Sequence, residues 1–432
     1  MSQRQVPINL LGSPLGKDAF IGNFDSELSS NEITEFIVRA LKSIDFTGKK
    51  VTLVVPDATR SCPLPTILPI FYEAISPVAA SLSALIALGT HAPMTPEAID
   101  KFLAGENQTT NQKYPSMKIY NHEWWEPSTF AHLGSITAEE ITKISMGQIT
   151  SEVPVSINRL VTESDLVIII GPVFPHEVVG FSGGAKYLFP GVSGQDMIDY
   201  SHWLGAIISS AEIIGTLGIT PVREMINLAA SKIEVPLLAL CLVVETGSST
   251  ISTLSFGAPH TAWEYASAVS SKKHIKFLSK PVKRVVSIMP ARYQDIWTAA
   301  KGMYKVEPII EDGGEVILFA PHITEFSITH KELEDIGYHC REYFSSQMEK
   351  FEGVSKTLMA HSSHLRGAGS FSTSEGERCR ITVTLSTGIS KARTEAMNLK
   401  YLDPSSFNLS DYENDPGVLI NHNAGEILYR LK

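Results

Sequence analysis

Three features are scarce in this sequence: closely spaced cysteines, basic residues in excess and long apolar runs. The 432 residues include four cysteines and no Cys-x-x-Cys pair, which argues against a cysteine zinc site or a disulfide framework. The formal net charge of −10 leaves no basic surplus to neutralise phosphates, so we expect neither nucleic acid nor an anionic membrane as a partner. The longest apolar stretches, residues 82–88 and 237–244, are too short to span a bilayer.

The composition is that of an ordinary globular protein. The hydrophobic fraction of 43% is sufficient for a full core, and at roughly 100–200 residues per domain the length predicts two or three domains. Residues 1–7 lack the apolar core of a signal peptide. We therefore expect a cytoplasmic protein.

Short apolar runs alternate with amphipathic stretches along the first two thirds of the chain. The predicted strands are residues 51–57, 81–88, 117–120, 165–170 and 235–243, and the predicted helices between them are residues 31–43, 64–75, 96–102 and 222–230. This alternation is typical of an α/β protein with mainly parallel sheets. A fresh strand begins at residue 284, so we expect two α/β domains, residues 1–280 and 281–432, with an active-site crevice between them. The Gly/Ser-rich residues 367–377 are expected to form a loop.

The segment from Pro175 to Gly191 is the most informative part of the chain. It follows the predicted strand at residues 165–170 and contains Ser182-Gly183-Gly184, with Lys186 close behind. Backbone N–H groups of such a loop can bind an anion, although the fixed spacing of a P-loop is missing. A Gly-Gly pair alone more often marks a turn; here the lysine and the nearby histidines, His176 and His202, add weight.

Reactive side chains follow two other predicted strands. Asp57 and Arg60 come after the strand at residues 51–57, and His91 comes after the strand at residues 81–88. Each alone is better explained as a turn-capping carboxylate, a surface arginine or a packed imidazole. Together, at strand ends of one sheet, they indicate an anion-binding active site with two candidate proton-transfer groups and a candidate metal ligand. Composition and spacing do not name a reaction.

The motifs resemble those of the nickel-pincer lactate racemase family. The matching stretches are Asp57–Arg60, Gly89–Thr95, Pro175–Lys186, Pro190–Gly194, His202 and Thr220–Glu224. The resemblance extends from about residue 57 to about residue 320, and the stretch from His176 to Lys186 is its most specific part.

The resemblance implies a covalent cofactor. In that family a pyridinium mononucleotide with two thiocarbonyl arms is attached to a lysine, here Lys186, and its nickel takes one histidine ligand, here His202. An imidazole with soft sulfur donors suits nickel. The remaining cofactor contacts are assigned to Asp57, Thr59, Ser182, Gly183 and Gly184. Separate enzymes make this cofactor, so they are expected partners, and protein produced without them is expected to lack it.

The resemblance also implies a reaction, inversion of the hydroxyl-bearing carbon of a 2-hydroxy acid. A base removes the hydroxyl proton while hydride leaves the carbon, and hydride then returns to the opposite face. Two proton donor/acceptors are needed, and they match His91 and His176, since an imidazole titrates near neutral pH. Arg60 and Lys301 would bind the substrate carboxylate.

The sequence departs from the lactate racemases in the second domain. Those enzymes have Tyr and Gln shortly before the lysine, whereas this chain has Trp297 and Thr298 before Lys301. Ala92 also replaces an arginine that often follows the catalytic histidine. We therefore expect a small-molecule substrate other than lactate, with a longer, aromatic or polyhydroxylated 2-hydroxy acid fitting beside Thr298 and Trp297.

Two other functions remain open on the sequence alone. His91, His176, His202 and Asp57 could instead form the zinc site of a hydrolase, although Lys186 then has no role. The chain could also be a non-catalytic homologue that binds a carboxylate or a nucleotide.

Overall fold

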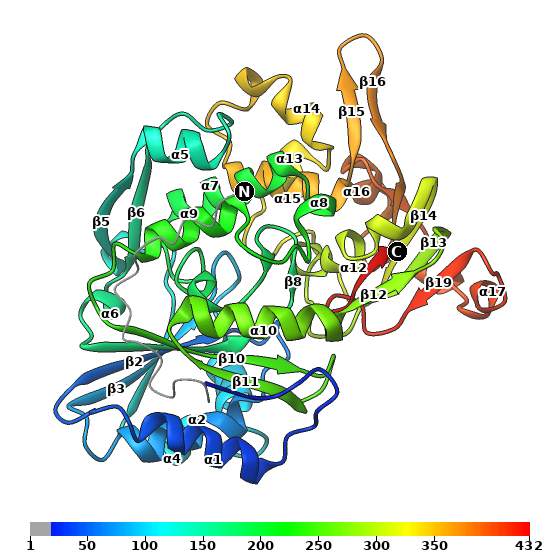
Figure 1. Cartoon of the computed structure of the whole chain (residues 1–432). Helices are drawn as coiled ribbons and strands as arrows, with labels where there is room; N and C mark the ends of the chain where they lie inside the picture. Colours follow the sequence, from blue (N-terminus) through cyan, green and yellow to red (C-terminus); the bar gives the residue numbers. More distant parts are fainter. Residues whose placement is uncertain (1–18) are drawn as a thin grey trace. The chain divides into compact units, whose positions relative to one another are not determined.

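The computed structural model describes residues 19–432 and divides the chain into two compact units (Figure 1). Of the described residues, the first unit contains 19–174, 182–198 and 217–273, and the second contains 175–181, 199–216 and 274–432. The last crossing, between residues 273 and 274, lies close to the division expected at residue 280. The two short segments were expected in the first domain, but they pack with the second unit.

Long-range hydrogen bonds hold these two segments in the second unit. The Gly215 N–H donates to the Gly180 carbonyl, 2.8 Å away. The Asp199 carboxylate accepts from the Thr357 N–H at 2.9 Å, at the start of a helix more than 150 residues further along the chain. His176 and His202 therefore belong to the second unit.

A seven-stranded sheet forms the centre of the first unit, in the order β1-β11-β10-β7-β2-β3-β4. The strands are β1 (Phe20–Gly22), β2 (Lys50–Pro56), β3 (Ser81–Ala87), β4 (Met117–Asn121), β7 (Leu166–Pro172), β10 (Leu237–Val244) and β11 (Ile251–Gly257). The strands from β10 to β4 are parallel, while β11 and β1 extend the sheet antiparallel. The predicted mainly parallel α/β fold is confirmed.

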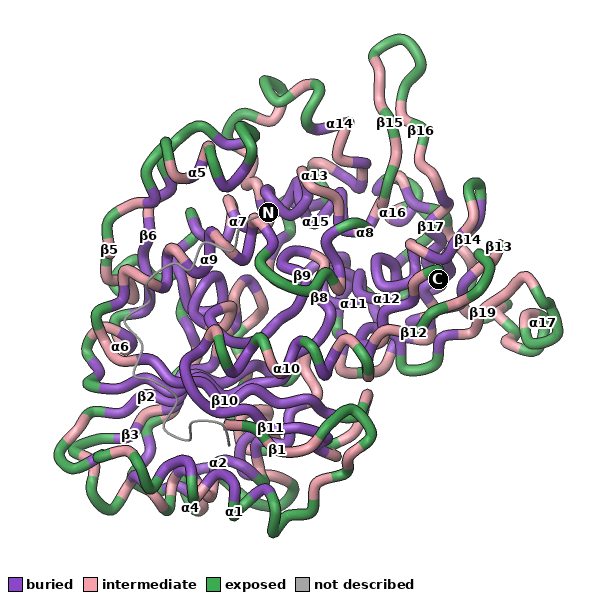
Figure 2. The backbone as a smooth tube through the Cα atoms, viewed as in Figure 1, coloured by how far each residue is buried: buried purple, intermediate pink, exposed green. Residues whose placement is uncertain are grey.

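The strands of this sheet are apolar because both faces are covered. Every residue of β7 and β10 is buried, as Figure 2 shows for the central strands, and such strands lack the alternation of half-exposed ones. The helices of the first unit are α1 (Ser30–Leu41), α2 (Leu64–Ile75), α3 (Pro96–Ile99), α4 (Thr110–Lys113), α5 (Ala138–Ile144), α6 (Arg159–Thr162), α9 (Pro221–Ala230) and α10 (Pro259–His274), with η2 (Asp100–Ala104), η3 (Pro127–Thr129) and η4 (Gly184–Tyr187). A hairpin of β5 (Phe130–Ile136) and β6 (Val153–Asn158) completes the unit.

The second unit has a five-stranded parallel sheet in the order β18-β17-β14-β13-β19. Its strands are β13 (Val282–Ile288), β14 (Ile310–Ala320), β17 (Thr382–Thr387), β18 (Lys400–Tyr401) and β19 (Val418–Asn421). Two-stranded pairs are β8 (Pro175–His176) with β9 (Gly180–Phe181), β12 (Ile275–Leu278) with β20 (Leu428–Leu431), and β15 (Gly369–Ser372) with β16 (Gly376–Cys379). The prediction of a loop at residues 367–377 is therefore wrong, because most of that segment pairs as the β15–β16 hairpin.

Short helices accompany this sheet. They are α8 (Ser210–Ile213), α11 (Ile296–Ala299), α12 (Lys301–Tyr304), η5 (Glu307–Ile309), α13 (Leu333–Ile336), α14 (Arg341–Ser345), η6 (Met348–Phe351), α15 (Lys356–Arg366), α16 (Lys391–Ala396), η7 (Pro404–Ser406) and α17 (Ser410–Glu413), while α7 (Gln195–Ile208) begins in the first unit and ends in the second. Among the helices of residues 19–432, none combines the length and the hydropathy that a membrane span requires.

Close packing explains the glycine pair of the expected anion loop. Gly183 and Gly184 have φ angles of +89° and +58°, which side-chain-bearing residues rarely adopt. A Cβ on Gly183 would lie 2.5 Å from Val173 Cγ2, and a Cβ on Gly184 would lie 2.9 Å from the Pro259 carbonyl oxygen. The fold of the first unit therefore requires both glycines, independently of any ligand.

We expect Gly184→Ala to destabilise the protein more than Gly89→Ala. Both glycines have a φ of +58°, so the backbone cost of alanine is alike, about 1–2 kcal/mol. A Cβ on Gly89 meets no atom within 4 Å, whereas overpacking at Gly184 should cost about 1–3 kcal/mol more. Chemical denaturation of the two variants measures the difference, and equal losses would contradict the packing seen here.

A buried histidine fastens three segments of the first unit. His122 follows β4, and its Nε2–H donates to the Ser193 carbonyl, 3.1 Å away. Its Nδ1 accepts from Asn158 Nδ2 at 3.2 Å. Burial lowers the pKa of His122 to about 4, although the bond to Ser193 opposes the shift.

This histidine should make the protein sensitive to acid. An unfolded imidazole takes up a proton below about pH 6.5, but the folded His122 resists protonation until about pH 4. Its contribution is complete above pH 6.5 and is lost as the pH falls to 4, by up to about 3 kcal/mol. His122→Asn should flatten this part of the stability–pH curve, whereas His132→Asn, at an exposed position, should leave it unchanged; equal curves for wild type and His122→Asn would refute the assignment.

Candidate active site

Asp57 and His91 meet at one edge of the first sheet. Asp57 follows β2 and His91 follows β3, and these strands pair in parallel, so their carboxyl ends lie side by side. His91 Nδ1 contacts the Asp57 carboxylate. Burial alone would raise the pKa of this carboxyl, but the charge and hydrogen bond of His91, with help from Thr59 and Arg60, hold the pKa below its usual range. An ionised carboxylate only accepts, so the proton of a neutral imidazole lies on Nδ1 and Nε2 keeps its lone pair.

Thr59 and Arg60 complete this turn. The N–H and the hydroxyl of Thr59 both donate to Asp57 Oδ1, at 3.1 and 2.6 Å, so Thr59 fixes the carboxylate that orients His91. The charge of Arg60 acts on Asp57 and on Tyr187. These expected site residues therefore lie together at the edge of the first sheet.

Lys186 lies on the same edge of the first unit. It is half-buried on η4, in the segment that follows β7, and β7 is the neighbour of β2. The Gly89 N–H donates to the Gly191 carbonyl at 2.9 Å. This bond joins the segment that carries Lys186 to the turn before His91.

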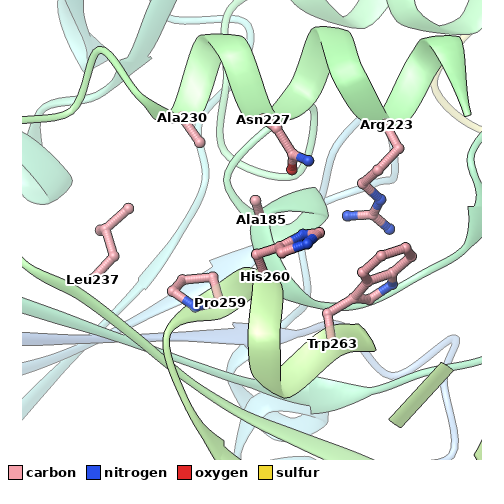
Figure 3. A pocket seen from close by; sticks show the side chains of 8 residues that line it. All are labelled: Ala185, Arg223, Asn227, Ala230, Leu237, Pro259, His260 and Trp263. Carbon is pink, nitrogen blue, oxygen red and sulfur yellow. The ribbon is translucent and has the colours of Figure 1, made fainter. Parts of the chain in front are cut away.

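Two side chains clamp the loop in front of Lys186, as Figure 3 shows in part. Arg223 Nη1 donates to the Gly183 carbonyl at 3.1 Å, and Trp263 Nε1 donates to the Ser182 carbonyl at 3.0 Å. The Arg223 guanidinium lies 4.2 Å from the centre of the Trp263 ring, and burial lowers the pKa of Arg223 to about 9. Sequence reasoning noted the stretch with Arg223 without a role for it and missed Trp263.

A narrow pocket borders this clamp (Figure 3). It is lined by Ala185, Arg223, Asn227, Ala230, Leu237, Pro259, His260 and Trp263. Its inner space of about 10 Å³ accommodates about one water molecule. The pocket is therefore too small for a nucleotide.

His176 lies on the β8–β9 hairpin of the second unit and is buried. Its Nδ1 accepts a hydrogen bond from the Val178 N–H at 3.1 Å, and the Glu177 carboxylate lies 3.3 Å from the same nitrogen. Because Nδ1 accepts from a backbone N–H, the proton of the neutral imidazole lies on Nε2. Nε2 of the neutral His176 therefore carries a proton, whereas Nε2 of the neutral His91 carries a lone pair.

Trp297, Thr298 and Lys301 lie around the start of α11 and α12. The Asp295 carboxylate caps α11 and bonds both the Thr298 N–H, at 3.0 Å, and the Thr298 hydroxyl, at 2.7 Å. Lys301 Nζ donates to the Thr298 carbonyl at 3.2 Å and lies 5.5 Å from the centre of the Tyr293 ring. The Thr298 hydroxyl is thus used within the helix turn.

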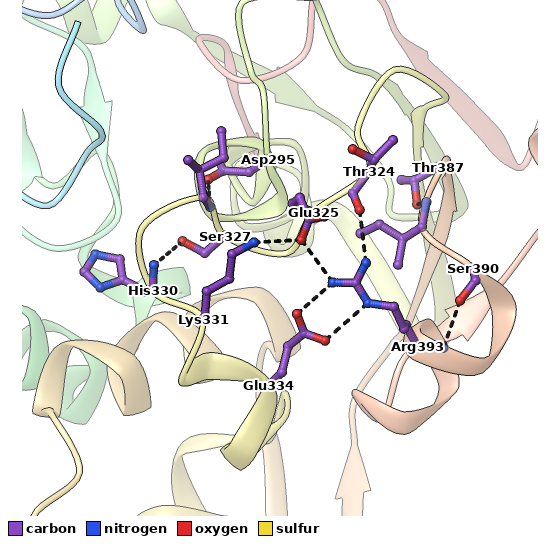
Figure 4. Close-up of polar contacts among 12 residues, drawn as sticks. Asp295, Thr324, Glu325, Ser327, His330, Lys331, Glu334, Thr387, Ser390 and Arg393 are labelled. Carbon is purple, nitrogen blue, oxygen red and sulfur yellow. Dashed lines mark hydrogen bonds and ion pairs between the residues drawn. The ribbon is translucent and has the colours of Figure 1, made fainter.

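Two histidines that sequence reasoning missed pack on Trp297. The ring centres of His361 and His330 lie 4.0 and 4.3 Å from that of Trp297. The backbone N–H of His330 donates to Ser327 Oγ at 3.0 Å and holds this residue in place (Figure 4). Burial, followed by the charges of the neighbouring histidines and Lys301, lowers the pKa of His361 well below its usual value, so this imidazole is neutral.

The segment before His330 is anchored by ion pairs on α16. Arg393 Nη2 lies 2.7 Å from Glu334 and 3.1 Å from Glu325, and Glu325 also pairs with Lys331 at 2.8 Å (Figure 4). These pairs fix both ends of the short segment that presents His330 to Trp297.

His202 lies on α7 and is half-buried. Its charge and that of Glu177 both act on His364, whose Nδ1 contacts Ser210 Oγ. His364 Nε2 is buried and has no hydrogen-bond partner within residues 19–432. His361 and His364 stand three positions apart on α15, a helical spacing that the sequence displays.

The expected site residues divide between the two units. The first unit holds Asp57, Thr59, Arg60, His91, Ser182, Gly183, Gly184 and Lys186, and the second holds His176, His202, Trp297, Thr298 and Lys301. Within residues 19–432, no group of three or more His, Cys, Asp or Glu side chains is arranged to hold a metal ion.

The chain is similar to proteins of one family. A family model described as the lactate racemase N-terminal domain matches residues 32–215. The lactate racemase of Thermoanaerobacterium thermosaccharolyticum is 25% identical over 279 residues, 63% of this chain and 60% of that enzyme. The lactate racemase of Lactiplantibacillus plantarum is 24% identical over 276 residues, 62% of this chain and 59% of that enzyme. The matched region thus spans about 60% of the length of these curated relatives.

Two solved structures resemble the whole chain. The crystal structure of a Thermotoga maritima protein has a TM-score of 0.86 and 30% identity, covering 94% of this chain and 99% of that one. The apoprotein of the T. thermosaccharolyticum lactate racemase has a TM-score of 0.69 and 19% identity, covering 94% of both chains, and supports the fold. The family model and the two sequence relatives show that the chain is similar to the lactate racemases.

Proposed function

We propose that this protein is a racemase or epimerase that inverts C2 of a 2-hydroxy acid. The observation that carries the proposal is the hydrogen bonding of two buried or half-buried imidazoles, which assigns them opposite tautomers. His91 offers a lone pair on Nε2 because its Nδ1–H faces the ionised Asp57. His176 offers an Nε2–H because its Nδ1 accepts from Val178.

Inversion requires a base for the hydroxyl proton of each enantiomer, and the imidazolium that forms returns the proton to the substrate oxygen. His91 Nε2 is the base for one enantiomer, and His176 is the base for the other after its proton moves from Nε2 to Nδ1. Asp57 stabilises the imidazolium that forms on His91, as a carboxylate does beside a catalytic histidine. Arg60 and Lys301 supply cations for the substrate carboxylate, and a guanidinium binds both oxygens.

The residues present fit a lysine-tethered nickel-pincer nucleotide. Lys186 is half-buried on a clamped turn that a hydrogen bond joins to the turn before His91. It would hold the group covalently, with Asp57, Thr59 and the loop Ser182–Gly184 beside the nucleotide and His202 on the nickel. The cofactor would itself supply sulfur ligands to the nickel, and the protein would add one imidazole. A cluster of protein ligands is therefore not required. When bound, the group would supply a reversible hydride acceptor for the substrate carbon.

The substrate is proposed to be a 2-hydroxy acid other than lactate. Trp297 and Thr298 replace the residues of the lactate racemases, and the Trp297 indole already packs on His361 and His330. The contact with the substrate side chain is therefore assigned to these two imidazoles, of which His361 is neutral, and not to a free indole face. Imidazoles donate and accept hydrogen bonds, which favours a polyhydroxylated side chain over an aromatic one.

Protein co-produced with the cofactor-making enzymes should interconvert the enantiomers or epimers of at least one larger 2-hydroxy acid. We expect kcat/KM to be highest for a polyhydroxylated acid, lower for phenyllactate and lowest for lactate, followed by loss of optical rotation and chiral chromatography. Lys186→Ala protein, which cannot be tethered, should be inactive on all three. A clear preference for lactate would refute the substrate assignment, and no turnover of any 2-hydroxy acid by the loaded protein would refute the function.

Asp57→Asn should lower kcat by about 10²–10⁴-fold, because the amide neither fixes the Nδ1–H tautomer of His91 nor balances its imidazolium. KM should change much less, since Asp57 is not placed against the substrate carboxylate. Asp45→Asn, which alters an exposed turn carboxylate bonded to the Thr47 N–H, is the matched control. A kcat within twofold of wild type for Asp57→Asn would contradict the role given to Asp57.

A further inference from the structure

A second pocket lies in the second unit, away from the residues assigned above. It has a volume of about 390 Å³ and a mainly polar lining. The lining residues come from the end of α15, the strands β16 to β18 and the end of α16: Arg366, Cys379, Ile381, Thr382, Glu395, Asn398, Leu399 and Lys400. Pockets of about 300–1,000 Å³ accommodate small organic molecules, so this one has room for more than an inorganic ion.

Arg366 is the unusual residue of this pocket. It is the last residue of α15 and is partly buried. Its Nε is buried and has no hydrogen-bond partner within residues 19–432. A buried donor without an acceptor is costly, and more so on a charged group. The charge of Arg366 helps to lower the pKa of the Glu377 carboxyl. The Glu377 carboxylate makes its hydrogen bonds to other groups, His339 at 2.8 Å and the Cys340 N–H at 2.6 Å.

The other charges of the pocket are balanced. Lys400 Nζ lies 3.2 Å from the Glu315 carboxylate, and Glu395 lies 3.8 Å from Lys391. Among the described lining residues, Arg366 is therefore the charged side chain without an ion-pair partner in contact. The positive charge of Arg366 is offset only at longer range, by the Glu377 carboxylate.

We propose that this pocket binds a small organic anion through Arg366. The planar guanidinium matches the two oxygens of a carboxylate or a phosphate, and Arg366 lines the pocket without an ion-pair partner in contact among the described residues. Thr382 and Asn398 give the rest of the pocket a polar wall, so the anion carries a polar body. This site is independent of the racemase proposal, since it contains none of the residues assigned to that reaction.

Calorimetric titration of the full chain tests the proposal, with tricarballylate as a carboxylate probe and glycerol 3-phosphate as a phosphate probe at constant ionic strength. At least one probe should bind, and Arg366→Gln should weaken that binding about ten- to hundredfold. Arg378→Gln, which removes an arginine exposed on the β15–β16 hairpin and paired with Glu375, should bind as wild type does. Arg60→Gln should also retain the binding, which separates this site from the proposed substrate site.

A crystallographic measurement on the wild-type protein tests the same site without relying on the folding of a variant. Wild-type crystals soaked in selenate should show an anomalous peak beside the Arg366 guanidinium, and Arg366→Lys, which keeps the charge but loses the fork, should bind the probe less tightly than wild type. The proposal is overturned if neither probe binds, if Arg378→Gln weakens binding as much as Arg366→Gln, or if selenate is absent from Arg366.

Discussion

The parallel pairing of β7, β2 and β3 is the constraint on which the candidate site depends. Parallel neighbours end at the same edge of a sheet, so the turns that follow these strands are brought together although the chain separates them. Asp57 and His91 meet there, and the hydrogen bond between Gly89 and Gly191 joins the segment of Lys186 to the same edge. These strands are largely buried, so the register is costly to change, because a slip of one residue would turn every side chain to the opposite face of the sheet.

The hydrogen bonds that each candidate catalytic histidine makes within its own unit determine which of its ring nitrogens carries the proton. A buried carboxylate fixes the proton of His91 on Nδ1, and a backbone N–H fixes that of His176 on Nε2. Each partner lies in the same unit as its histidine. Such fixed hydrogen bonds would lower the reorganisation that the proposed proton transfer requires.

The sequence was sufficient for the elements whose signal is local. Apolar runs predicted the central strands, and strand ends located the candidate residues. Long-range contacts were beyond it: the bond between Asp199 and Thr357 joins segments that no periodicity connects. Composition also misled at residues 367–377, because Gly and Ser favour turns but a hairpin needs only backbone pairing. The spacing of His361 and His364 on one helix was visible, but their place beside the candidate site depends on how α15 packs.

The most direct test of this account is a measurement of the histidine tautomers by ¹⁵N–¹H correlation spectroscopy of the labelled protein at neutral pH. His91→Gln and His176→Gln variants assign the two resonances. The account predicts a protonated Nδ1 and a bare Nε2 for His91, and a bare Nδ1 and a protonated Nε2 for His176. Finding the same tautomer in both histidines would contradict the central claim that their local hydrogen bonds fix opposite tautomers.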